Sequence, residues 1–164
     1  TTGRMGPVLL DIPMNIQKEL VSEEQKARAL KDSLQVQNTN SEINPVLTDF
    51  FSNSNRPLVI IGAGLAFNSK VEKTQMWCEN FGIPYVATWA AMPYLERSKS
   101  GYLGTIGVYG SRIANWSVQA ADKIIVLGSR LDNRQRTGNP KGFAPFAQIL
   151  VLDIDEEELK KYLN

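Results

Sequence analysis

The sequence predicts an α/β fold in which a mostly parallel, doubly wound β-sheet carries helices on both faces. From Arg56 onward, short apolar runs alternate with segments typical of helices. Such alternation favours parallel strands joined by right-handed helical crossovers. The apolar runs lack a polar side, as expected for strands that are buried on both faces. Glycines and polar residues follow these runs, at the edge where open parallel sheets bind ligands.

The first 55 residues do not show this alternation. Residues 7–12 form an apolar run that Pro13 ends, and they are predicted to be a strand. A lone leading strand indicates that its partners lie in a preceding domain, so residues 1–19 are interpreted as the exit strand of that domain. Residues 20–55 are predicted to be a linker, with a polar helix, a loop at residues 38–41 and a short amphipathic helix that begins near Asn44.

Residues 56–164 are predicted to be the main domain. We expect strands at 58–61, 85–87, 123–127 and 148–153, and helices at 69–81 and 111–121. Residues 101–110, which contain several glycines, are interpreted as a loop, and residues 139–147 as a loop that could contain a short helix. A final helix is predicted after Asp155, with Glu158 as the reciprocal partner of this cap.

Composition excludes several classes of function. The chain contains no histidine, which excludes His-dependent triads, imidazole bases and His-based zinc sites. Its net charge of +1 gives no electrostatic case for binding nucleic acid or an acidic membrane. We find neither an apolar run near the length of a membrane span nor a signal peptide. The single cysteine, Cys78, fits a reducing cytoplasm and the core face of a helix, with a reactive thiol as the alternative.

Residues 127–138 follow a predicted strand and are rich in arginine. In an extended chain, Arg130, Asp132, Arg134 and Arg136 would project on the same side. Guanidinium groups arranged in this way suit a phosphate or a carboxylate, and the aspartate would hold one arginine in place. The alternative is a solvated polar loop.

Two glycine-rich segments follow other predicted strands. Gly62 and Gly64 form an incomplete dinucleotide fingerprint, with Phe67 where the third glycine belongs. Residues 83–89 lack the acidic residue that would bind a nicotinamide ribose, so a standard NAD site is not expected. Glycines 104, 107 and 110 would let the backbone approach a ligand, although glycines also serve tight turns without any ligand.

Other residues at the strand ends leave alternatives open. Asp153 could accept a hydrogen bond from a ribose hydroxyl, or it could serve only to cap the final helix. The aromatic side chains of Trp77, Trp89, Trp116 and Phe146 are interpreted as packing residues, with stacking on a ligand as the alternative.

The order of these motifs resembles the central domain of thiamine-diphosphate-dependent enzymes of the acetolactate synthase type. The resemblance implies a six-stranded, Rossmann-like sheet that holds FAD in a structural role, an ADP group, or nothing. Tyr109 departs from the pattern, because flavin-binding relatives tend to have histidine there. The motifs that carry the resemblance are residues 3–17, 62–64, Thr88, 103–110, 129–134 and 152–155. The residues that it implies at the nucleotide are Gly62, Gly64, Thr88, Gly104, Gly107, Gly110, Gly128, Arg130, Asp132, Arg134, Asp153 and Ile154.

The resemblance also implies that the chemistry lies outside this sequence. In the family, the N-terminal pyrimidine-binding domain carries the glutamate that activates thiamine diphosphate, and the C-terminal domain holds Mg²⁺ and the diphosphate. We therefore expect this chain alone to be inactive. The full-length enzyme would be a cytoplasmic transferase or lyase that acts on 2-oxo acids and forms a homodimer or homotetramer. Two alternatives remain: a purely architectural domain with a vestigial site, and a stand-alone nucleotide-binding module, including an NAD-dependent deacylase-like one.

Overall fold

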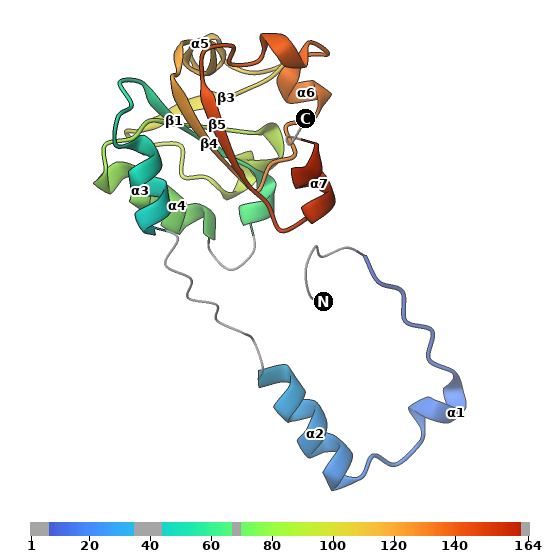
Figure 1. The fold of residues 1–164 in the computed structure, drawn as a ribbon. Helices are drawn as coiled ribbons and strands as arrows, with labels where there is room; N and C mark the ends of the chain where they lie inside the picture. Colours follow the sequence, from blue (N-terminus) through green and yellow to red (C-terminus); the bar gives the residue numbers. More distant parts are fainter. Residues whose placement is uncertain (1–6, 35–43, 67–69, 162–164) are drawn as a thin grey trace. The chain divides into compact units, whose positions relative to one another are not determined.

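The computed structural model describes residues 7–34, 44–66 and 70–161 (Figure 1). The chain divides into two compact units, Thr1–Ile43 and Asn44–Asn164. The predicted loop at residues 38–41, Phe67 and the predicted helix start at Ser69 lie outside the described residues. The predicted domain boundaries after residues 19 and 55 stay a prediction.

The first unit contains two helices, α1 (Met14–Gln17) and α2 (Glu23–Leu34). Ser22 caps α2, because its hydroxyl accepts a hydrogen bond from Gln25 N–H at 3.2 Å. Residues 7–12 adopt no regular secondary structure in this chain, and their pairing with strands of a preceding domain stays a prediction. A strand is stabilised by hydrogen bonds to a neighbouring strand. The described part of this unit contains no strand with which residues 7–12 could pair.

The second unit contains a five-stranded, fully parallel sheet with the strand order β3-β2-β1-β4-β5. This arrangement confirms the predicted doubly wound, Rossmann-like α/β fold, but the described residues form five strands rather than six. The strands are β1 (Pro57–Ile61), β2 (Tyr85–Ala87), β3 (Tyr102–Thr105), β4 (Lys123–Leu127) and β5 (Gln148–Leu152). The helices and 3₁₀ turns are α3 (Asn44–Phe51), η1 (Ala63–Leu65), α4 (Lys70–Asn80), η3 (Trp89–Tyr94), α5 (Arg112–Ala120), α6 (Asn133–Arg136), η4 (Pro140–Gly142) and α7 (Glu156–Lys160).

β3 lies within the segment that the sequence predicts to be a loop. Its four residues include Gly104, and none of them is fully buried. The strand therefore lacks the apolar run that identifies the other strands. It forms because β2 offers a free edge, although the pairing of β2 with β3 contains a register irregularity between Tyr85 and Ala87.

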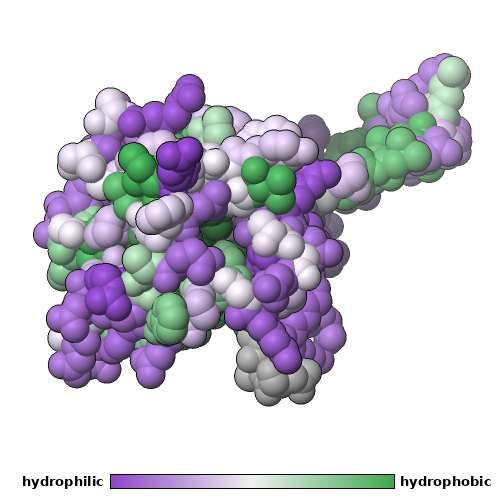
Figure 2. All heavy atoms as spheres, turned by 90° about the horizontal axis from the view of Figure 1, so that it is seen from above, coloured by the Kyte–Doolittle hydropathy of each residue, from purple (hydrophilic) through white to green (hydrophobic). Residues whose placement is uncertain are grey.

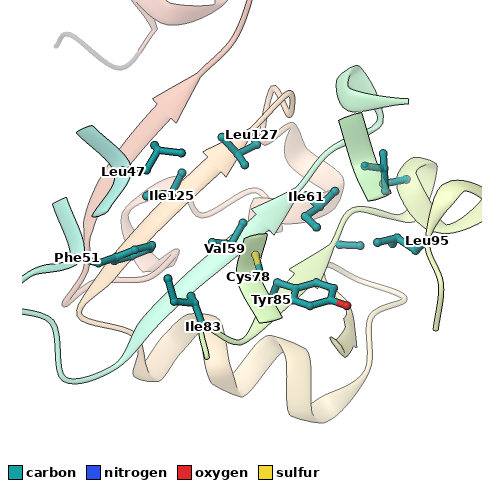
Figure 3. Close-up of a cluster of buried hydrophobic side chains, with 13 residues drawn as sticks. Leu47, Phe51, Val59, Ile61, Cys78, Ile83, Tyr85, Leu95, Ile125 and Leu127 are labelled. Atoms are coloured by element: carbon teal, nitrogen blue, oxygen red, sulfur yellow. The ribbon is translucent and has the colours of Figure 1, made fainter. Parts of the chain in front are cut away.

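Helices cover both faces of the sheet, and the residues of β1 alternate between two cores. Val59 and Ile61 belong to one hydrophobic cluster, which also contains residues of α3 and α4 (Figure 3). Leu58 and Ile60 belong to a second cluster, which contains residues of α5. These four side chains are at most 2% exposed. Burial on both faces explains why β1 reads as a continuous apolar run.

Asp122 joins the amino ends of β1 and β4. Its carboxylate accepts hydrogen bonds from the Ser54 hydroxyl, from Asn55 N–H at 2.8 Å and from Arg56 N–H at 3.1 Å. The hydrogen bond from Ser54 is the main reason why the pKa of Asp122 is lowered from 3.8 to about 2. The carboxylate thus fixes the entry into the two central strands.

No helix in the described part of the chain combines the length and the apolar character needed to cross a membrane. The face of the molecule in Figure 2 shows hydrophobic residues (green) scattered among hydrophilic ones (purple).

Candidate functional site

The candidate site lies at the carboxyl ends of the strands, where the chain reverses its direction of winding. β1 is followed along the chain by β2 and β3 on one side, whereas β4 and β5 lie on its other side. The loops after β1 and β4 therefore flank the switch point at which doubly wound sheets bind ligands.

Three predicted site glycines bring these two loops into direct contact. Gly64 N–H donates a hydrogen bond to Gly128 O at 2.9 Å. A Cβ atom on Gly62 would lie 2.1 Å from Gly128 O, and one on Gly64 would lie 2.8 Å from the same atom. Gly128 has a φ of +61°, which favours glycine. The chain's own backbone therefore requires these glycines; a further role toward a ligand stays a prediction.

Gly104 in β3, and Gly107 and Gly110 in the loop that follows, also meet the chain's own atoms. A Cβ atom would lie 2.4 Å from Ser111 Oγ at Gly104, 2.3 Å from Arg134 O at Gly107 and 2.4 Å from Thr105 O at Gly110. The loop is thus packed against its surroundings instead of forming an open cradle.

The arginine-rich run is not extended, so the predicted alternation of its side chains is wrong. Residues 133–136 form α6, and Asp132 caps this helix by accepting a hydrogen bond from Arg134 N–H at 2.8 Å. Leu131, with a φ of +45°, turns into the second core and is 1% exposed. Residues 129–138 pair with no strand in the described part of the chain, and aspartate is a strong helix cap, so a turn of helix replaces the extended run. Arg134 and Arg130 are both exposed.

Arg130 lies near an acidic side chain from another element. Its guanidinium is 3.9 Å from the carboxylate of Glu158 in α7. Glu158 does not complete the predicted reciprocal cap, because Asp155 N–H donates to Asp153 Oδ1 at 3.0 Å. Asp155 itself caps α7 as predicted, by accepting from Glu157 N–H at 3.1 Å. One carboxylate oxygen of Asp153 thus has a structural role at the start of the final helix. This agrees with the structural alternative for Asp153 and leaves binding of a ribose hydroxyl a prediction.

An open recess lies beside the loop after β3. Trp89 and Tyr109, whose ring centroids are 6.2 Å apart, are 56% and 82% exposed, so the interpretation of Trp89 as a packing residue is wrong. Trp116 and Phe146 are also exposed. The lining residues of the recess are Trp89, Thr105, Ile106, Val108, Tyr109, Arg134 and Gln135.

The remaining predicted residues differ in their exposure to solvent. Thr88 is buried at the end of β2, where its N–H donates to Ile61 O at 2.9 Å. Ile154 is 69% exposed after β5. Cys78 is fully buried in the core, and burial raises its pKa to about 12, which contradicts the reactive-thiol alternative.

Two contacts near the site could not be recognised from motifs. Asn115 of α5 bonds the backbone of Gly107, and Val108 N–H donates to Arg134 O at 3.0 Å. These contacts fix the loop after β3 against α5 and α6. The available signal for Asn115 was its position between Ala114 and Val118, the two buried residues of α5. Among the described residues, no group of three or more Cys, Asp or Glu side chains is placed to hold a metal ion.

Comparison with known proteins gives a consistent family. Residues 46–164 match the thiamine pyrophosphate enzyme central domain. The chain is 30% identical over 160 residues to the acetolactate synthase isozyme 2 large subunit of Escherichia coli K12, covering 98% of this chain and 28% of that protein. It is 33% identical over 171 residues to the acetolactate synthase large subunit of Lactococcus lactis, covering 99% of this chain and 28% of that protein.

The match to a plant relative also covers nearly all of this chain but only part of the relative. The chain is 30% identical over 163 residues to the chloroplastic acetolactate synthase 2 of Nicotiana tabacum, covering 98% of this chain and 24% of that protein. The chain thus spans about a quarter of the length of these relatives. It belongs to the thiamine pyrophosphate enzyme family, and residues 46–164 are the central domain.

Proposed function

We propose that this chain is the central part of a longer thiamine-diphosphate-dependent enzyme that acts on 2-oxo acids, as an acetolactate synthase does. The names of the relatives support this activity, and the match over 98% of the chain does not favour a stand-alone nucleotide-binding module. N- and C-terminal domains of the longer protein, a homodimeric or homotetrameric assembly and a cytoplasmic location belong to the same proposal.

The proposed task of the chain itself is to hold an adenine-containing nucleotide, FAD or ADP, in a structural role. The single observation that carries this proposal is the combination of exposed cations and exposed rings at one edge of the sheet. Arg130 and Arg134 follow β4, and Arg134 lines the recess that also contains Trp89 and Tyr109. Guanidinium groups bind phosphates, and exposed aromatic faces stack on flat rings.

The donor set therefore fits a ligand with an anionic and an aromatic part. Arg134 would bind the phosphates, while Trp89 and Tyr109 would orient a ring at the surface of the recess. The packed glycines support this task indirectly, because they fix the loops from which these side chains project. Thiamine diphosphate, when bound by the longer protein, supplies the carbanion chemistry. The predicted Mg²⁺ belongs with that cofactor.

Titration with ADP and with FAD, followed by calorimetry, tests the nucleotide site. We expect Arg134→Gln to weaken ADP binding about tenfold or more, because a hydrogen bond to a charged group contributes about 1.5–3 kcal/mol. Arg97→Gln is the matched control, since Arg97 is also exposed. It precedes the amino end of β3, whereas the candidate site lies at the carboxyl ends of the strands. Absence of binding, or equal affinities of the two variants, would favour the architectural alternative.

A second experiment tests where the reaction takes place. The purified chain is incubated with pyruvate, thiamine diphosphate and Mg²⁺, and pyruvate consumption is measured. We expect no turnover. Turnover by the chain alone would contradict the assignment of the catalytic groups to the rest of the longer protein.

A further inference from the structure

We infer that Glu158 competes with a bound phosphate for Arg130 and thereby limits the affinity of the site for anions. This inference rests on the proposed nucleotide site. Glu158 comes from α7, after the last strand, whereas Arg130 comes from the loop after β4. One carboxylate oxygen of Glu158 lies 3.9 Å from the Arg130 guanidinium, and the other lies 2.5 Å from Lys161 Nζ.

The backbone around α7 holds the Glu158 carboxylate in this place. β5 pairs with β4 along its whole length, so the segments that follow the two strands lie at the same edge of the sheet. Asp153 Oδ1 accepts the Asp155 N–H, and Asp155 caps the first turn of α7. The Glu158 side chain is only 12% exposed, whereas that of Arg130 is 53% exposed. The glutamate is therefore confined, and the arginine still presents part of its guanidinium to solvent.

This placement has an electrostatic consequence for any anion at Arg130. A phosphate that binds the exposed part of the guanidinium lies within several ångströms of the Glu158 carboxylate, and the two negative charges repel each other. The ion pair with Glu158 also neutralises part of the arginine's charge in the free protein. Loss of the Glu158 charge removes both effects and strengthens phosphate binding. Because Arg130 is half exposed, dissolved salt screens the effect.

The experiment compares Glu158→Gln with Glu157→Gln by calorimetric titration with ADP. Both variants remove one negative charge from α7 and one ion pair with a lysine three residues later, at 2.5 Å in each case. Glu158 is chosen because its carboxylate lies 3.9 Å from the Arg130 guanidinium. We expect Glu158→Gln to bind ADP roughly three- to tenfold more tightly than the unchanged chain at low salt, with a smaller difference at high salt. Glu157→Gln is expected to stay within about twofold of the unchanged chain.

Two further proteins, Arg130→Gln and the double variant Arg130→Gln with Glu158→Gln, test whether the effect passes through Arg130. In the Arg130→Gln background, the gain from Glu158→Gln should be largely lost. Equal affinities of Glu158→Gln and Glu157→Gln, weaker binding by Glu158→Gln, or a full gain without Arg130 would each overturn the inference while leaving the nucleotide site intact. If neither the unchanged chain nor Glu158→Gln binds ADP, the proposed site and the inference both fail. Binding by Glu158→Gln alone would support the inference that Glu158 limits the affinity of the site.

Discussion

The side-chain amide of Asn115 bonds both backbone groups of Gly107. Its Oδ1 accepts from Gly107 N–H at 2.9 Å, and its Nδ2 donates to Gly107 O at 3.0 Å. Gly107 is buried, with a φ of +104°. The asparagine therefore substitutes for a strand partner where the chain leaves β3, and it holds the loop that carries Tyr109.

Replacement of Asn115 by alanine should destabilise the second unit. The change leaves two backbone groups without their partner, which costs about 1–3 kcal/mol for each buried group. We expect a lower urea midpoint with an unchanged slope, measured by circular dichroism. Gln119→Ala is the control, because Gln119 lies on the same helix and donates one exposed hydrogen bond to Gly142 O. Similar midpoints for the two variants would show that the double hydrogen bond contributes little.

A comparison of Gly82 with Gly128 separates two effects of adding a Cβ atom: strain in the backbone at positive φ, and steric overlap with neighbouring atoms. Their φ values are +63° and +61°, but a Cβ atom on Gly82 meets nothing within 4 Å, whereas one on Gly128 would lie 3.0 Å from Leu65 N. We expect Gly82→Ala to cost about 1–2 kcal/mol of unfolding free energy through its backbone conformation alone. Gly128→Ala should cost about 1–3 kcal/mol more, because the two loops must move apart. Chemical denaturation measures both, and equal losses would show that the contact between the loops adapts freely.

Asp122 should make the stability of the protein depend on pH in the acidic range. Its pKa is about 2 in the folded protein and 3.8 without the fold. The unfolded state therefore binds the proton more tightly, so the carboxylate stabilises the fold above pH 3.8 and loses this effect as the pH falls toward 2. We expect the difference in melting temperature between the unchanged chain and Asp122→Asn to be constant near neutral pH and to shrink over this range.

Asp49→Asn is the control for this experiment, because Asp49 is exposed on α3 and the substitution removes the same charge. The corresponding difference for Asp49→Asn should not show this decline between pH 3.8 and 2. A difference for Asp122→Asn that persists unchanged at pH 2 would contradict the role of the ionised carboxylate.

The Cys78 thiol should not react with thiol reagents in the folded protein. The thiol is fully buried, and desolvation raises its pKa from 9.0 to about 12. The reactive species is the thiolate, so we expect no reaction with an aromatic disulfide reagent at mildly alkaline pH until the protein is unfolded in guanidinium chloride. Measured release of the coloured thiol gives the result directly. Rapid labelling of the native protein would show that the helix carrying Cys78 opens readily.

Two of the strands that were predicted correctly, β1 and β4, share one physical property. β1 and β4 each show an apolar run, because both faces of these central strands are buried. β3 was missed because its four residues include a glycine and form no apolar run, whereas β5, also an edge strand, contains four consecutive apolar residues. Residues 7–12 also form an apolar run, but no strand among the described residues pairs with them and they adopt no regular secondary structure.

The site residues stay a prediction, and the arrangement of their side chains could not be predicted from the sequence. The sequence indicates which residues follow each strand, since strand ends can be located along the chain. It does not indicate that Asp132 caps a helix, that Asp153 binds Asp155 N–H, or that Glu158 faces Arg130. Each of these contacts depends on the direction of a side chain that a local pattern leaves open.

The sequence by itself thus determined the fold class and the edge of the sheet at which polar residues gather. Both follow from local regularities, namely apolar runs of strand length and the alternation of strands with helices. Only the tertiary structure decided which atoms occupy the space beside the glycines and which charge lies opposite Arg130. The reason is that Gly62 and Gly128, like Arg130 and Glu158, are distant along the chain and meet only because the parallel sheet brings β1, β4 and β5 together.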